Sequence, residues 1–167
     1  KLNKPFGAVA TDLQTGERTL FRRGNTGMAV RASSSVPGVF QPVNISGRDY
    51  VDGGLTSPVP VAAAREMGGD VVIAVDISSK PALTKVEGTL DILMQTVNIM
   101  GKRLGDYELA EADVVIRPSV GHMGSAEFEQ KHMAILEGEK ALQAALPSIR
   151  ARLAAWRPKA TAVASGQ

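Results

Sequence analysis

Apolar and polar positions alternate over short stretches in the first third of the chain, a pattern typical of β-hairpins. Residues 5–13 and 17–22 flank a glycine-containing turn and predict one hairpin. Residues 40–45 and 48–52 flank Ser46-Gly47 and predict a second. The first third of the chain is therefore expected to supply two antiparallel pairs of strands.

Longer apolar periods follow and predict helices separated by short buried strands. Continuous β-branched runs at 71–77 and 113–117 favour strands that are covered on both faces. Together with 5–13 they are expected to form the centre of one mixed sheet. Helices are expected over 27–34, 58–68, 86–104 with a stop at Gly105, and from about 125 to 156 with a restart at Pro147.

Composition and charge exclude several classes of protein. The chain has 167 residues and no cysteine, so disulfide frameworks, thiolate metal sites and cysteine nucleophiles are ruled out. Residues 1–146 carry 15 basic and 17 acidic side chains, and the net charge of +2 arises from four basic residues after position 146. Because the body is not basic, nucleic acid is not an expected partner.

The strongest candidate for chemistry is the segment Tyr50-Val51-Asp52-Gly53-Gly54. An aspartate at the end of a strand, followed by two glycines, lies where ligands gather in α/β sheets, and the glycines permit close backbone approach. Asp52 is then a candidate general base. From these five residues alone, the alternative that Asp52 only closes its own turn is favoured.

Other polar residues carry weaker signals. Ser33-Ser34-Ser35 lacks the Gly-x-Ser-x-Gly context of a nucleophile and is typical of a helix end. His122 and His132 are expected to be surface or hydrogen-bonded side chains, and no metal site or nucleotide-binding loop is predicted. Trp156 among basic residues is interpreted as a solvated helix end, with a membrane-surface anchor as the alternative.

Three segments together resemble the patatin-like phospholipases, in particular their bacterial members. They are Val30 to Phe40 with its Ser-Ser-Ser-Val-Pro-Gly core, Asp52-Gly53-Gly54 with the following Pro58-Val59-Pro60, and Gly69 to Asp76. The similarity covers about residues 5 to 80, with weaker agreement to about 155. The resemblance implies a three-layer α/β/α sandwich and a lipid acyl ester hydrolase with a Ser-Asp dyad. It assigns Asp52 as the dyad aspartate, with Gly53 and Gly54 in support, and no cofactor.

The family's glycine-rich oxyanion loop and serine elbow are absent from this sequence. We therefore interpret residues 1–157 as the C-terminal portion of one domain, with residues 158–167 as a flexible tail. The chain alone is expected to be inactive, and the missing serine to lie upstream. A cytoplasmic protein is expected, with transient membrane-surface contact left open and the oligomeric state undetermined. The alternative is a non-catalytic binding or regulatory protein on the same scaffold.

Overall fold

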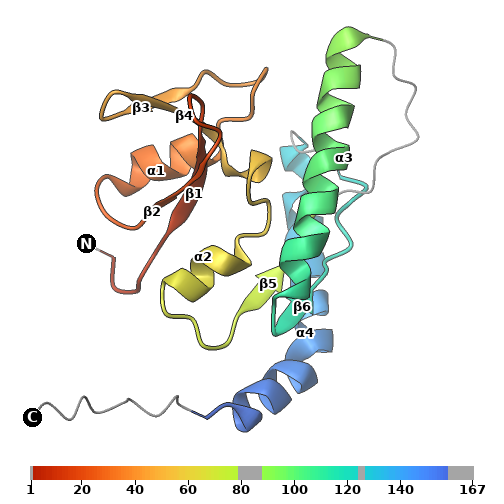
Figure 1. Ribbon diagram of the computed structural model, residues 1–167. Helices are drawn as coiled ribbons and strands as arrows, with labels where there is room; N and C mark the ends of the chain where they lie inside the picture. The colour runs from red at the N-terminus through yellow and green to blue at the C-terminus, as the bar shows by residue number, and fades with distance from the viewer. Residues whose placement is uncertain (1, 79–87, 124–126, 158–167) are drawn as a thin grey trace, which may run out of the picture.

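The computed structural model describes residues 2–78, 88–123 and 127–157, and the predicted tail at 158–167 lies outside this range. Strands and helices alternate along the described chain, as an α/β fold requires. In Figure 1, a sheet with one small helix lies on one side and two long helices on the other. The predicted α/β class is therefore confirmed.

Both predicted hairpins are present and belong to one antiparallel sheet. Its strands are β1 (Ala8–Asp12), β2 (Arg18–Phe21), β3 (Val43–Ile45) and β4 (Arg48–Asp52), in the order β2-β1-β4-β3. Ser46 and Gly47 both adopt positive φ angles, 53° and 82°, as the tightest hairpin turns require. Local turn chemistry thus sets the register of β3 against β4.

Helix α1 (Thr26–Ser33) packs on this sheet and forms the first core. The side chain of Asn25 caps the helix by accepting a hydrogen bond from the amide of Met28 at 3.1 Å. Ala32 of α1 lies fully buried against Ala10 and Tyr50 of the sheet. Because Ala10 and Ala32 have small side chains, α1 packs close to the sheet and to β4, the strand that ends at Asp52.

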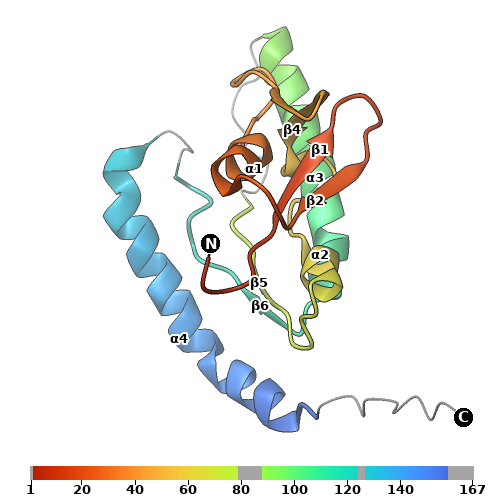
Figure 2. The ribbon, with the colours of Figure 1, turned by 90° about the vertical axis from the view of Figure 1, so that its left-hand side faces the viewer.

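The second part of the chain builds three layers around a parallel pair of strands. Its elements are α2 (Val61–Glu66), β5 (Ile73–Val75), α3 (Thr89–Ala110), β6 (Val114–Ile116) and α4 (Lys131–Ala155). Ala74 packs with α2 and α3, whereas Val114 and Ile116 pack with Ile149 of α4. Helices therefore cover both sides of this pair, and Figure 2 shows α4 running along one side of it.

The prediction of one mixed sheet is wrong for the described residues, which form two sheets. Strand β4 already pairs with β1 on one edge and β3 on the other, so β5 has no free edge of β4 to join. Strand β5 pairs in parallel with β6 instead. Its Ile73 and Val75 are 41% and 52% exposed, so the expected burial on both faces is also wrong.

Three predicted helix boundaries differ from the structure. Helix α2 begins only at Val61, after both prolines of the preceding loop. Helix α3 continues past Gly105 to Ala110 because Leu109 is buried in the core with Val61 and Ala74. Helix α4 passes through Pro147 without a restart. The proline removes one ladder hydrogen bond and crowds the preceding turn, and the packing of Ile149 on β6 offsets this cost.

Candidate active site

Asp52 is the last residue of β4, and its backbone forms hydrogen bonds with two other parts of the chain. Its amide donates to the carbonyl of Ser35, just beyond α1, at 3.0 Å. Its carbonyl accepts from the hydroxyl of Thr11 on β1 at 2.9 Å. These two hydrogen bonds fix the main chain of Asp52 relative to the end of α1 and to β1.

Gly53 and Gly54 are each required at their positions for a different steric reason. A Cβ at Gly53 would lie 2.2 Å from the carbonyl oxygen of Val9, so only glycine fits against strand β1. A Cβ at Gly54 would lie 3.0 Å from Asp52 Oδ1 and would push the carboxylate aside. The expected close approach of the backbone is thus found at Gly53, whereas Gly54 leaves room for the Asp52 side chain.

One oxygen of the Asp52 carboxylate is used in the turn and the other is not. The amide of Gly54 donates to Oδ1 at 2.7 Å, capping the 3₁₀ turn Gly53–Leu55. Within the described part of the chain, no other group donates to this carboxylate. Burial raises the pKa of the Asp52 carboxyl above its ordinary value, and the Gly54 amide opposes that rise.

Asp52 borders two cavities. The first, an apolar groove of about 560 Å³, runs between the Asp52 turn and helix α3. Its apolar lining includes Val36, Leu55, Val75, Leu93, Met94 and Val97. The second, of about 400 Å³, is lined by the start of β1 and the end of α1. Asp52, Gly54 and Pro58 therefore form a boundary that the two cavities share.

The remaining sequence candidates lie as the structural interpretation predicted. The hydroxyls of Ser34 and Ser35 donate to the carbonyls of Val30 and Arg31 at 3.0 and 2.8 Å, closing the end of α1. His122 and His132 are both exposed. No group of metal-ligating side chains occurs among residues 2–78, 88–123 and 127–157.

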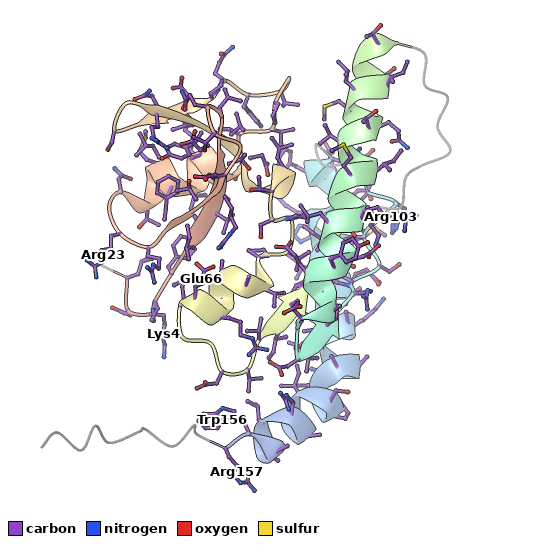
Figure 3. The ribbon with its side chains drawn as sticks, in the orientation of Figure 1. Lys4, Arg23, Glu66, Arg103, Trp156 and Arg157 are labelled. Atoms are coloured by element: carbon purple, nitrogen blue, oxygen red, sulfur yellow. The ribbon has the colours of Figure 1, made fainter. Side chains whose placement is uncertain are left out.

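The basic C-terminal end of α4 behaves as a helix end. Arg157 donates to the carbonyls of Ala154 and Trp156 at 2.7 and 3.0 Å, satisfying acceptors that the helix leaves free. Figure 3 shows Trp156 and Arg157 together at this end. Among the described helices, none has the length and apolar character needed to cross a membrane.

Glu108 is a residue that sequence reasoning missed. Its carboxylate accepts from the hydroxyl of Ser57 and, at 2.8 Å, from the amide of Val59. Ser57 in turn donates its amide to the carbonyl of Gly53 at 2.8 Å, so Glu108 ties α3 to the turn beside Asp52. Its position in the sequence could have indicated this role, because Glu108 is a charged residue that follows Leu104 by one helical turn on the apolar face of the helix.

Comparison with known proteins gives one family match, over the first part of the chain. Residues 3–65 match the family model of the patatin-like phospholipases. The match includes Asp52, Gly53 and Gly54, as well as β1 and α1, which hold Asp52 in place. The resemblance to this family is thus confirmed over the segment that builds the candidate site.

Curated relatives agree with the family match. The chain is 41% identical over 78 residues to an NTE family protein of Mycobacterium tuberculosis, covering 47% of this chain and 22% of that protein. A second NTE family protein of that species is 28% identical over 170 residues, covering 87% and 29%. Mouse patatin-like phospholipase domain-containing protein 7 is 35% identical over 78 residues, covering 46% and 6%. This chain therefore spans less than a third of the length of each.

Proposed function

We propose that this chain supplies the general base of a lipid acyl ester hydrolase, with Asp52 as the aspartate of a Ser-Asp dyad. The nucleophilic serine would come from a segment outside this sequence. One observation carries the proposal: Asp52 lines an apolar groove, Gly54 holds one oxygen of its half-buried carboxylate, and no residue among 2–78, 88–123 and 127–157 donates to the other oxygen. The family match and the mouse patatin-like phospholipase domain-containing relative support a lipid ester as substrate.

The proposed reaction uses the free oxygen of Asp52. The serine hydroxyl attacks the ester carbonyl carbon, and its proton moves to Asp52 across a hydrogen bond of roughly 2.6–3.2 Å. Asp52 then returns that proton to the leaving alcohol as the carbon–oxygen bond of the ester breaks. The same carboxylate then deprotonates a water molecule that attacks the acyl carbon, and Asp52 returns this proton to the serine oxygen as the acyl–serine bond breaks and the carboxylic acid is released.

Two features of the structure suit Asp52 to this role. The hydrogen bond from Gly54 fixes the orientation of the carboxylate without occupying its second oxygen. Burial raises the pKa of the Asp52 carboxyl, which strengthens its carboxylate form as a base. Activity is therefore expected to fall as the pH drops through this raised pKa, because protonated Asp52 cannot accept the serine proton.

The test is Asp52→Asn in the complete gene product, with kcat/KM measured on a medium-chain p-nitrophenyl ester. Asparagine keeps the size of the side chain and an acceptor for Gly54, but it cannot take a proton. We expect kcat/KM to fall by roughly 100- to 10,000-fold, with an unchanged melting temperature.

Asp49→Asn is the matched control, because Asp49 lies on the same strand and its carboxylate binds Asn44 and Gln14 at the surface. We expect its activity to stay within a few fold of the wild type. Near-wild-type activity in Asp52→Asn would exclude Asp52 as the base.

A second candidate function is a non-catalytic binding protein on the same scaffold. The bond from Gly54 to Asp52 favours it, because this bond also fits a carboxylate that only closes its turn. In that case Asp52→Asn, which keeps the acceptor for Gly54, leaves both the melting temperature and any activity of the complete gene product nearly unchanged.

A further inference from the structure

Three cations and two exposed apolar side chains share one surface, formed by the first residues of the described chain and the segment just after β2. Lys4, Arg22 and Arg23 are the cations, and all three are exposed. Leu2 and Phe6 have exposed fractions of 56% and 43%. All five residues, which we call the basic surface, line one cavity of about 510 Å³. Figure 3 shows Lys4 and Arg23 on the same side of the molecule.

The positive charge of the basic surface is not neutralised within the described part of the chain. A neighbouring cavity of about 730 Å³ shares both arginines, and no described aspartate or glutamate lines either cavity. Glu66 lies near this region, but its carboxylate pairs with Arg18. Arg22 reaches only the main-chain carbonyl of Glu66, at 3.5 Å. None of the ion pairs between described residues involves a cation of the basic surface. Its charge is therefore available to an external partner.

The combination of cations with exposed apolar side chains fits an anionic lipid surface. Lysine and arginine are attracted to anionic headgroups, and leucine and phenylalanine gain free energy by entering the boundary between headgroups and acyl chains. A soluble polyanion would neutralise the cations but would leave Leu2 and Phe6 in water. The basic surface also adjoins the candidate active site, because Phe6 lines the cavity of about 400 Å³ that Asp52 borders. Only this last reason rests on the proposed function.

We propose that the basic surface docks the protein onto an anionic membrane. Its two apolar side chains enter the headgroup region, and its three cations contact lipid phosphate groups. This inference goes beyond ester hydrolysis, because it names the surface of the molecule that meets the lipid bilayer. The surface also differs from the end of α4, where Arg157 caps the helix by donating to the carbonyls of Ala154 and Trp156.

The test is cosedimentation of the complete gene product with vesicles, made either of phosphatidylcholine alone or of phosphatidylcholine mixed with phosphatidylglycerol. We expect binding to the mixed vesicles that weakens with added salt, and little binding to the neutral ones. Lys4→Glu combined with Arg23→Glu is expected to lower the partition coefficient for mixed vesicles at least tenfold, because it reverses two of the three positive charges.

Arg103→Glu combined with Lys131→Glu is the matched control. It replaces one arginine and one lysine and therefore makes the same change in net charge. Both residues are exposed, on α3 and at the start of α4. Figure 3 shows Arg103 across the molecule from Arg23. We expect the control to bind mixed vesicles within threefold of the wild type.

The apolar part of the basic surface is tested by Leu2→Ser combined with Phe6→Ser. We expect at least threefold weaker binding to mixed vesicles, because less apolar surface enters the membrane. Retention on heparin, a soluble polyanion, is expected to stay unchanged. Circular dichroism checks that each variant is folded, and Leu2→Ser alone serves if the double variant is not, with the same direction of change expected.

Three outcomes would overturn the proposal. The first is that the wild type does not bind mixed vesicles, and the second is that the charge variant and its control lose binding equally. The third is retention on heparin together with vesicle binding that the serine substitutions leave unchanged, which would indicate a soluble polyanion as the partner. None of these measurements requires ester hydrolysis, so their result is independent of whether Asp52 acts as a base.

Discussion

Asp113 connects four elements of the second part of the fold, and its replacement by asparagine tests how that part is held together. Its carboxylate accepts from Arg65 of α2 at 2.6 Å and from Arg152 of α4 at 2.7 Å. It also accepts from the amide of Val72, just before β5, at 2.8 Å. Asp113 itself immediately precedes β6. Asp113→Asn keeps the shape of the side chain and removes the charge that all three donors share.

The size of the effect follows from the pKa of Asp113. The amide of Val72 and the two arginines lower this pKa from 3.8 to about 2, against a smaller opposing effect of burial. At about 1.4 kcal/mol per pKa unit, the full shift corresponds to an upper limit of roughly 2 kcal/mol. The side chains of Arg65 and Arg152 are 37% and 49% exposed, so water screens part of this interaction. We expect Asp113→Asn to lower the free energy of unfolding by about 1–2 kcal/mol at pH 7.

The assay is urea unfolding followed by circular dichroism, on wild type and variant, at several pH values. The pKa of Asp113 is lower in the folded state than in the unfolded state. Its stabilisation is therefore complete above about pH 5 and is lost as the pH falls towards 2. The difference in unfolding free energy between the two proteins is expected to shrink over the same range.

Asp106→Asn is the control, because Asp106 forms an exposed pair with Lys102 one helical turn away. Such surface pairs contribute about 0.5 kcal/mol or less. A loss below about 0.5 kcal/mol for Asp113→Asn at pH 7, or a loss that does not change between pH 7 and pH 2.5, would refute the reasoning.

Two further predictions concern the turn beside Asp52. Gly53→Ala is expected to lower the free energy of unfolding by about 1–3 kcal/mol, because the new methyl group overlaps the carbonyl of Val9; an unchanged urea midpoint would contradict this. Glu108→Ala is expected to cost about 1–3 kcal/mol, because it leaves the amide of Val59 without its acceptor. Glu111→Ala, at the exposed end of the same helix, should have no measurable effect on thermal unfolding. Equal losses of stability in the two variants would argue against a stabilising role for the hydrogen bonds of Glu108 with Ser57 and Val59.

Local signals in the sequence determined the small elements of this protein correctly. Ser46-Gly47 turns the second hairpin and Asn25 caps α1, because these features depend only on neighbouring residues. The same local reasoning placed Asp52 at the end of a strand and explained the need for Gly53 and Gly54. The resemblance to patatin-like phospholipases rested in part on Asp52-Gly53-Gly54, and the family match covers this segment.

Features that join distant segments could not be predicted in this way. The spacing of apolar residues does not reveal that β4 has partners on both edges, so the separation of β5 and β6 into a second sheet was missed. A glycine stop was expected at Gly105, yet the helix continues because burial of Leu109 outweighs the weak local preference of glycine.

The surroundings of Asp52 show most clearly which features follow from neighbouring residues and which depend on tertiary packing. The sequence by itself identified Asp52 as the residue to examine, because a carboxylate before two glycines is a local pattern. Only the tertiary structure brought Gly101 and Glu108 of α3 next to the Asp52 turn, across about fifty residues of chain. Contacts of that separation are decided by how whole helices and sheets pack. The reason for a glycine within a helix can therefore be given only when the residues packed against it are known.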